Sequence, residues 1–252
     1  MTAKVSGMQD KWKVGHGGTL DPFADGVLIV GLGSGCKSLP NYLSSQKQYT
    51  GKATLGVSTD TQDIEGMIDQ VLPYGFVTEQ TILDALPKFT GQIYQTPPMY
   101  SALKLNGKPL YEYARKGLEV PTFDKTRMVS IYRLEINDFY NPELIDTEIN
   151  SNNRLVKIND KARDIPISQH GSFGFTVECS KGTYIRTLFK DICAFIGTAG
   201  FLTSLTRTKQ GPYELGKDTI TLEDLKNKDL VISKIQKCTL AHNQYFNDTI
   251  KL

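Results

Sequence analysis

The chain has 252 residues, of which 39% are hydrophobic, and its formal net charge at pH 7 is only +2. This composition is typical of a globular protein with one main domain, and so weak a charge does not by itself indicate a polyanionic partner. The sequence has no run of about 18 apolar residues and no apolar N-terminal stretch, so we expect no membrane span and no secretory signal, and an intracellular protein with nucleus, cytoplasm and mitochondrion all open.

The hydrophobic pattern predicts alternating strands and helices along the chain. In chain order it predicts a short strand at 27–30, a helix at 39–43, a strand at 49–57, a helix capped by Thr78, a helix from Pro109 to Gly117, and strands at 128–136 and 173–179. The segment around 138–172 is rich in Asn, Asp and Ser, and we expect it to be a polar insertion on the surface.

The next predicted helix has an unusual first turn. We expect it to begin with Thr183 as its N-cap and to carry one apolar face, formed by Ile185, Leu188, Phe189, Ile192 and Phe195. Arg186 falls in the first turn, where the helix dipole disfavours a cation by roughly 0.3–1 kcal/mol. We therefore expect a buried or cleft carboxylate to compensate Arg186.

Charge is unevenly distributed along the chain. Residues 100–133 hold seven basic side chains against three acidic ones, whereas 135–148 hold five acidic side chains and no basic one. The basic side chains are Lys104, Lys108, Arg115, Lys116, Lys125, Arg127 and Arg133, with Tyr100, Tyr111 and Tyr113 among them. This segment is suited to a nucleic-acid backbone, and a solvated helix face is the alternative.

Metal chemistry is not indicated by the sequence. Four cysteines are widely spaced and lack histidines at zinc-ligand spacing, which predicts reduced thiols: Cys36, Cys179, Cys193 and Cys238. Asp60, Asp63 and Glu65 have only part of the spacing of a calcium loop, and we interpret them as turn residues.

The densest motif is KVGHGGTLDPFADGVLIVGLG, residues 13–33. Asp21 directly precedes Pro22, which biases its backbone to extended geometry and so fixes the direction of the carboxylate. Taken alone, LDP is most simply a turn with a capping Asp. A phosphate-binding loop would need Lys followed by Ser or Thr, and a dinucleotide fingerprint would need differently placed glycines, so we reject both.

The motif resembles the catalytic block of the TruB family of tRNA pseudouridine synthases. Three further blocks resemble that family in the same order: QKQYTGKATLG with STDTQDIEG, QTPPMYSALKLNGKPLYEYARKG, and CSKGTYIRTLFKDI with LTRTKQGPY. Together they cover about residues 14–216. GHGG and LTRTKQGPY are closer to eukaryotic members, which indicates a eukaryotic-type synthase for tRNA position 55.

The resemblance implies three catalytic residues. Asp21 matches the aspartate that acts as nucleophile at C1′ or base at C2′ when the C1′–N1 bond of uridine is cleaved. Arg186 matches the arginine that pairs with this aspartate and keeps it ionised. Tyr184 matches the tyrosine assigned to removing the C5 proton after the base has rotated and rejoined.

Three substrate-binding residues follow from the same resemblance. Tyr49 matches the tyrosine that stacks on the flipped base, and otherwise it would be an ordinary strand aromatic. His16 matches the histidine near the flipped nucleotide, where it can fill the space that the base vacates; a lone His before a Gly-rich turn is more often structural. Leu205 matches a leucine beneath the uracil, and core packing describes it equally well.

The family pattern also sets expectations for the ends of the chain. Members usually have a KPxGxTS segment some twenty or more residues before the catalytic block, and residues 1–15 do not match it, so we expect the N-terminal strand to be missing. We expect residues 1–225 to form the catalytic domain and 226–252 a C-terminal tail, with no RNA-binding PUA domain.

The resemblance implies an α+β pseudouridine synthase fold, with a long mixed, mostly antiparallel sheet flanked by helices. The expected activity is isomerisation of uridine in the T loop of tRNA after base flipping, by a monomer that needs no cofactor or metal. The T arm of tRNA is the expected partner, with mRNA hairpins as further candidates and no membrane. A catalytically inactive RNA-binding or tRNA-folding protein derived from this family is the alternative.

Overall fold

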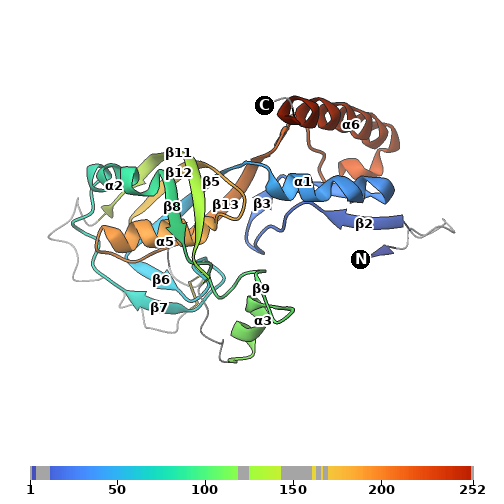
Figure 1. The fold of residues 1–252 in the computed structure, drawn as a ribbon. Coiled ribbons are helices and arrows are strands. Elements are labelled where there is room, and N and C mark those ends of the chain that lie inside the picture. Colours follow the sequence, from blue (N-terminus) through green and yellow to red (C-terminus); the bar gives the residue numbers. More distant parts are fainter. Residues whose placement is uncertain are drawn as a thin grey trace. The chain divides into compact units, whose positions relative to one another are not determined.

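The computed structural model describes residues 2–3, 12–118, 125–142, 161–162, 166 and 170–250. The chain divides into two compact units, a first unit of Met1–Tyr49 with Thr206–Leu252 and a second unit of Thr50–Leu205. Two long strands, β5 (Lys47–Leu55) and β13 (Gly200–Gln210), run from one unit into the other (Figure 1).

The first unit combines the two ends of the chain. Its other elements are β1 (Thr2–Ala3), β2 (Trp12–His16), β3 (Asp25–Gly26), β4 (Val30–Leu32), the 3-10 helix η1 (Gly33–Ser38), α1 (Leu39–Ser44), β14 (Tyr213–Glu214), the 3-10 helix η6 (Asp224–Lys226) and α6 (Lys228–Ile250). Strand β2 pairs antiparallel with β1 and β4, while β3 pairs parallel with β13. The parallel pair places the segment after residue 24 directly beside β13.

The second unit carries most of the sheet. Its other elements are β6 (Val57–Thr59), β7 (Ile68–Val71), α2 (Glu79–Ala85), the 3-10 helix η2 (Leu86–Phe89), β8 (Gly91–Gln95), β9 (Lys104–Leu105), β10 (Lys108–Pro109), α3 (Leu110–Arg115), β11 (Arg127–Tyr140), β12 (Ser172–Cys179) and α5 (Ile185–Phe195). Among the described residues the main sheet has the order β14-β13-β5-β12-β11-β8, with β3 beside β13. A mixed, mostly antiparallel sheet with flanking helices confirms the predicted α+β class.

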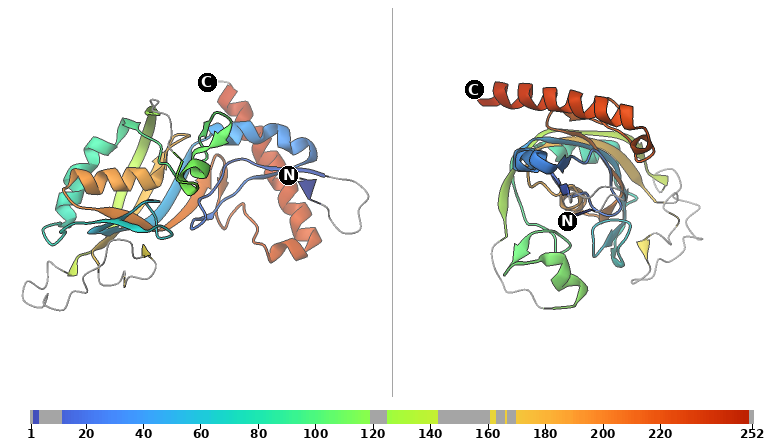
Figure 2. Two further views of the ribbon diagram at one scale, coloured as in Figure 1. Left: turned by 90° about the horizontal axis from the view of Figure 1, so that it is seen from below. Right: turned by 90° about the vertical axis from the view of Figure 1, so that its right-hand side faces the viewer.

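Helix α5 lies against the sheet of the second unit (Figures 1 and 2), and aromatic side chains join the two. Phe189 stacks on Phe175 of β12 with ring centroids 3.8 Å apart, and the ring centroid of Phe173 lies 5.9 Å from that of Phe189. All three side chains are buried, and each contributes roughly 1.5–3 kcal/mol of apolar burial. The start of α5, which carries Tyr184 and Arg186, is therefore attached to a rigid core.

Helix α6 is held to the first unit by small and polar side chains. Tyr42 hydrogen-bonds both Tyr213 and His242, and Tyr213 donates to the Cys238 carbonyl at 2.8 Å. Ala241 packs against the same cluster. Burial is the largest cause of the raised pKa of Tyr42 and Tyr213, so both phenols stay neutral donors and acceptors. The predicted tail is therefore a helix from residue 228 to residue 250.

The predicted elements are largely confirmed, with two corrections. The Thr78 side chain accepts from the Thr81 N–H in a capping box, as predicted. Helix α5, however, has Tyr184 rather than Thr183 as its N-cap, because the Thr183 hydroxyl instead donates to the Ser180 carbonyl at 3.1 Å. The strand predicted at 27–30 begins only at residue 30, since Val27 is held to β13 by tertiary hydrogen bonds.

Most of the predicted polar insertion lies outside the described residues. Residues 4–11 also lie outside them, and they are part of the segment that is predicted to lack the family's N-terminal strand. Ala162, a described residue of the insertion, is fully buried with Val57, Ile68 and Phe201, so this position belongs to a core cluster. Within the described part of the chain, no helix is both long and apolar enough to span a membrane.

Candidate active site

Asp21 lies in a tight turn of the first unit. The Ala24 N–H donates to the Asp21 carbonyl at 3.0 Å, which closes a four-residue turn with Pro22 in its second position. Asp favours the first position of such turns and Pro the second, since its ring fixes φ. The Asp21 side chain is half-buried. The turn thus holds a carboxylate in one place without burying it completely.

Two buried side chains of β13 fix the approach to this turn. The Arg207 guanidinium is 2% exposed and donates through Nε to the Val27 carbonyl at 2.7 Å, and more weakly to the carbonyls of Gly18 at 3.3 Å and Thr19 at 3.4 Å. Gln210 donates to the Gly17 carbonyl at 2.6 Å. A buried cation needs such acceptors to offset its lost hydration. Arg207 and Gln210 explain why LTRTKQGPY accompanies GHGGTLDP in this chain.

Glycine is required where the segment passes β13. Gly26 has φ +103°, and a Cβ there would lie 2.3 Å from the Arg207 carbonyl oxygen. Gly18 has φ +143°, and a Cβ there would lie 3.3 Å from the Gln210 amide nitrogen. Side chains rarely tolerate such conformations, so glycines let the loop lie close to Arg207 and Gln210.

His16 and Tyr49 belong to the same unit as Asp21. His16 ends β2, opposite Val30 of β4, and its side chain is exposed. Tyr49 lies in β5 and is half-buried. Both positions suit side chains that would meet a nucleotide, and both roles stay predictions.

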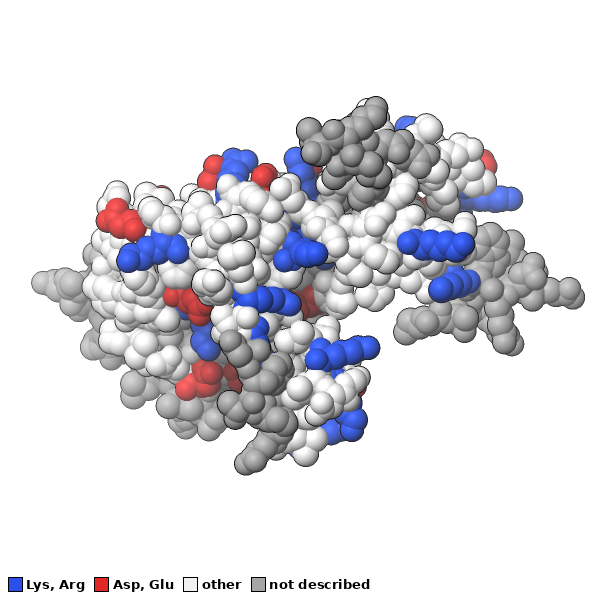
Figure 3. Space-filling view, viewed as in Figure 1, with Lys and Arg blue, Asp and Glu red and all other residues white. Residues whose placement is uncertain are grey.

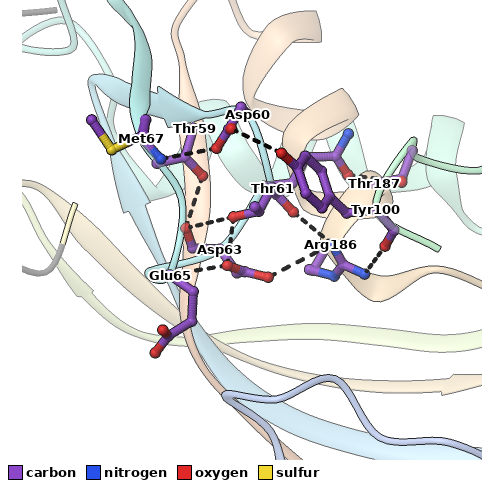
Figure 4. Close-up of polar contacts among 10 residues, drawn as sticks. Thr59, Asp60, Thr61, Asp63, Glu65, Met67, Tyr100, Arg186 and Thr187 are labelled. Atoms are coloured by element: carbon purple, nitrogen blue, oxygen red, sulfur yellow. Dashed lines mark hydrogen bonds and ion pairs between the residues drawn. The ribbon is translucent and has the colours of Figure 1, made fainter. Parts of the chain in front are cut away.

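Arg186 lies in the second unit, 3% exposed, at the start of α5 (Figure 4). Its guanidinium donates to the carbonyls of Thr61 at 2.6 Å and Tyr100 at 2.8 Å. Its Nη1 also lies 3.6 Å from the Asp63 carboxylate, which is itself buried. Asp63 is therefore a carboxylate that compensates the cation in the first turn. The predicted pairing of Arg186 with Asp21 stays a prediction, because the two residues belong to different units.

Asp63 is held by its own turn between β6 and β7 (Figure 4). Its Oδ1 accepts from the Thr61 hydroxyl at 2.6 Å and from the Glu65 N–H at 3.0 Å. The interpretation of Asp63 as a turn residue is thus correct but incomplete, since the turn aims its other oxygen at Arg186. The expectation of a buried carboxylate beside Arg186 is confirmed, but the sequence does not identify Asp63 as that carboxylate.

Asp60 links the same turn to Tyr100. The Met67 N–H donates to Asp60 at 2.9 Å, and the Tyr100 hydroxyl donates to the other carboxylate oxygen at 3.4 Å. Burial, followed by the charge of Asp60, raises the pKa of Tyr100. The segment whose carbonyl accepts from Arg186 is therefore tied to the Asp63 turn a second time.

Tyr184 and Leu205 also lie in the second unit. Tyr184 is the half-buried N-cap of α5, two residues before Arg186. Leu205 in β13 is 5% exposed, as expected of a core residue or of a side chain beneath a base. Within the described residues, no group of three or more His, Cys, Asp or Glu side chains is arranged to hold a metal ion.

Comparison with known proteins gives one family. The family model described as TruB family pseudouridylate synthase (N terminal domain) matches residues 4–154. The tRNA pseudouridine synthase B of Geotalea uraniireducens is 40% identical over 212 residues, which cover 84% of this chain and 58% of that protein. That of Geobacillus thermodenitrificans is 39% identical, with 90% and 67% covered.

The human pseudouridylate synthase TRUB1 is 37% identical over 227 residues, which cover 90% of this chain and 56% of that protein. The chain thus spans between 56% and 67% of the length of these three relatives. A chain in the solved Cbf5-Nop10-Gar1 complex matches with a TM-score of 0.53 and 26% identity, covering 84% of this chain and 45% of that one. Bacterial and human relatives match at similar identity, so these comparisons support the family rather than one branch of it.

Proposed function

Because the chain belongs to the TruB family of pseudouridylate synthases, we propose that it isomerises uridine to pseudouridine in the T loop of tRNA, at position 55. The observation that carries the proposal is the family match over residues 4–154, which includes Asp21 and its flanking glycines. The anchored turn around Asp21 adds a physical reason, since a nucleophile must be held where it can attack.

Asp21 would act on the sugar of the target nucleotide. Its carboxylate would attack C1′, or remove the C2′ proton, as the C1′–N1 bond breaks. The freed uracil would rotate and bond to C1′ through C5, while the Asp21 carboxylate leaves C1′ or returns the proton to C2′. The C5 proton then leaves and a proton returns to N1. No atom or electron is gained overall, so the isomerisation itself needs no redox partner.

The turn around Asp21 would contribute preorganisation. Arg207 and Gln210 fix the carbonyls of the segment that leads into the turn, and Pro22 limits the turn itself. A catalytic group displaced by 1 Å can lose about a hundredfold in rate. We infer that Arg207 and Gln210 of the LTRTKQGPY strand serve catalysis by holding the segment that leads to Asp21, without contacting the substrate themselves.

The target base must leave the RNA stack to reach Asp21, at a cost of a few kcal/mol. Tyr49 would stack on the flipped base, an interaction worth about 1–3 kcal/mol. Exposed His16 would enter the space that the base vacates, and Leu205 would pack beneath the uracil. Arg186, held by Asp63, would offer a fixed positive charge to Asp21.

The β9-β10 hairpin and α3 provide a basic surface for the RNA backbone. Figure 3 shows Lys and Arg side chains gathered where β9 and α3 lie. Lys104, Lys108, Arg115 and Lys116 are all exposed on these elements. Such side chains gain affinity by neutralising phosphates, so binding would weaken as salt is raised. Their distribution supports the predicted RNA-binding segment.

The test is to incubate the purified protein with an unmodified T-arm hairpin and with full-length tRNA, digest the RNA, and quantify pseudouridine by chromatography. Mass alone does not register the isomerisation, so the position is mapped by a carbodiimide adduct that stops reverse transcription. Pseudouridine at the T-loop uridine alone supports the proposal. Modification only of other RNAs, such as mRNA hairpins, contradicts the tRNA substrate, and tight tRNA binding without modification favours the inactive RNA-binding protein.

A further inference from the structure

Two side chains meet the segment that leads into α5, and neither belongs to the predicted catalytic set. Gln95 ends β8 and Arg127 begins β11, and the two residues are direct partners in the antiparallel ladder. Their positions in the sheet are therefore fixed by backbone hydrogen bonds. Both side chains are directed at residues 182–184, which include Tyr184.

Gln95 binds both polar backbone groups of Tyr184. Its Oε1 accepts from the Tyr184 N–H at 2.7 Å, and its Nε2 donates to the Tyr184 carbonyl at 3.0 Å. The Gln95 side chain is 1% exposed, so water does not compete for these bonds. Tyr184 lacks a side-chain cap at this helix end. The side-chain amide therefore fixes the backbone of the N-cap residue.

Arg127 contacts the aromatic ring of Tyr184. Its guanidinium carbon lies 4.9 Å from the centroid of the Tyr184 ring, within the range of a cation–π contact. Its Nη2 donates to the Gly182 carbonyl at 2.6 Å, while its buried Nε has no acceptor in the described part of the chain. Gly182 has φ +79°, and a Cβ there would lie 3.3 Å from the Arg127 guanidinium carbon. Only a glycine allows this close approach without displacement.

We propose that Gln95 and Arg127 are positioning residues for Tyr184, with Gln95 fixing its backbone and Arg127 the orientation of its phenol. The inference rests on the proposed function, in which Tyr184 removes the C5 proton of the rejoined uracil. A group that transfers a proton must lie within hydrogen-bond reach of it, and this reach depends on the ring orientation. Gln95 and Arg127 act on the later proton removal and leave the earlier bond cleavage by Asp21 unchanged.

The first experiment measures, without any RNA, how strongly the backbone of Tyr184 is protected from hydrogen exchange. Amide hydrogen exchange at Tyr184 is compared in the wild type, Gln95→Ala and Gln92→Ala, a matched variant of an exposed glutamine on the same strand. We expect exchange at Tyr184 to accelerate at least tenfold in Gln95→Ala and to stay unchanged in Gln92→Ala. Equal exchange in all three proteins would overturn the proposal, whether or not the protein is a pseudouridine synthase.

The second experiment measures the step that is affected. With RNA carrying deuterium at C5 of the target uridine, Gln95→Ala is expected to lower kcat by about ten- to a hundredfold, to change KM less than threefold, and to raise the deuterium isotope effect. Arg127→Met is expected to do the same. A fall in kcat with an unchanged isotope effect would mean a merely structural role and would contradict the proposal.

A double-mutant cycle connects the effect to Tyr184. In a Tyr184→Phe background, Gln95→Ala should lower kcat by less than threefold, because the phenol it positions is already absent. Equal factors in both backgrounds would show that Gln95 acts elsewhere. If Gln95→Ala fails to fold, Gln95→Glu keeps the acceptor for the Tyr184 N–H and serves in its place. Wild-type turnover by Tyr184→Phe would overturn the inference while leaving the proposed role of Asp21 intact.

Discussion

Arg207 in the first unit and Arg186 in the second are both almost completely buried, but they are held in different ways. Arg207 donates only to backbone carbonyls in the described part of the chain, around the loop that carries Asp21. Arg186 donates to two carbonyls and also has the buried carboxylate of Asp63 as an ion-pair partner. The same side chain thus serves as a scaffold in one unit and as part of a charged cluster in the other.

The partners explain this difference better than burial does. Carbonyl oxygens satisfy the donors of a buried guanidinium but leave its charge unneutralised, which suits a residue that organises backbone. A carboxylate satisfies the donors and also holds the positive charge in one position. This suits a residue that is proposed to act through its charge. The family resemblance assigns a role to Arg186 and none to Arg207, although Arg207 lies in the LTRTKQGPY motif and binds backbone carbonyls on both sides of Asp21.

The largest expected effect on stability follows the replacement of Arg207. Arg207→Met removes the donors of three backbone carbonyls in the first unit. The Val27 and Gly18 carbonyls become unsatisfied buried acceptors at about 1–3 kcal/mol each, whereas water can replace the weak bond to exposed Thr19, so the free energy of unfolding should fall by about 2–6 kcal/mol. Urea denaturation measures it. Lys209→Met is the control on the same strand. Its side chain is 45% exposed and forms only a surface ion pair with Glu214, so the free energy of unfolding should change by less than about 1 kcal/mol. Equal losses in the two variants would refute the scaffold role.

Gly26→Ala tests the same scaffold from the backbone side. The added Cβ would lie 2.3 Å from the Arg207 carbonyl oxygen, at a residue with φ +103°. Strain of this kind costs of order 1–3 kcal/mol, and the close contact adds to it, so we expect a loss of about 2–4 kcal/mol. Gly35→Ala is the control, because nothing lies within 4 Å of its added Cβ. If both glycines tolerate alanine equally, the close approach of residue 26 to β13 is wrong.

Replacing Asp63 tests the charged cluster in the second unit. Asp63→Asn keeps an acceptor for the Thr61 hydroxyl and the Glu65 N–H but removes the charge that faces Arg186. We expect turnover to fall about ten- to a hundredfold, because Arg186 loses its fixed position, with a stability loss of about 1–3 kcal/mol. Glu65→Gln, at an exposed position of the same turn, should leave turnover unchanged. Wild-type turnover by Asp63→Asn would show that the ion pair does not matter to the reaction.

The smallest expected effect is a pH dependence in α5, the helix that carries Arg186. Burial raises the pKa of the Cys193 thiol from its ordinary 9.0 to about 12. Above pH 9 the unfolded chain loses this proton while the folded chain keeps it, so the free energy of unfolding falls as pH rises from about 9 toward 12. Cys193→Ala should flatten this decline in urea titrations. An unchanged slope would contradict the tight burial of this helix.

Local signals in the sequence predicted much of the fold. Thr78 is identified by its own hydroxyl and by the helical pattern that follows, and the capping box forms as expected. The prediction of Thr183 as the N-cap of α5 is wrong because the actual N-cap, Tyr184, is held by Gln95, a residue 89 positions away. Helix α6 gave a weak signal because Cys238, Ala241 and His242 anchor it, rather than a stripe of large apolar residues.

The candidate site was predictable only as far as family motifs extend. Asp21 and Arg186 are predicted because they match motif positions, and the first-turn location of Arg186 indicates a nearby carboxylate. The sequence identifies Asp63 only as a turn residue, since nothing local shows where its second carboxylate oxygen points. Arg207 and Gln210 bind carbonyls 189 and 193 residues away, a relation that no local pattern encodes.

The catalytic role of Asp21 is tested most directly by the turnover of Asp21→Asn compared with Asp25→Asn, an isosteric change at an exposed carboxylate in the same segment. Pseudouridine formed in T-arm RNA is quantified for both variants and the wild type under single-turnover conditions. We expect pseudouridine from the wild type and from Asp25→Asn, and at least a thousandfold slower formation from Asp21→Asn with RNA binding retained. Wild-type formation by Asp21→Asn would contradict the assignment of Asp21 as the catalytic carboxylate.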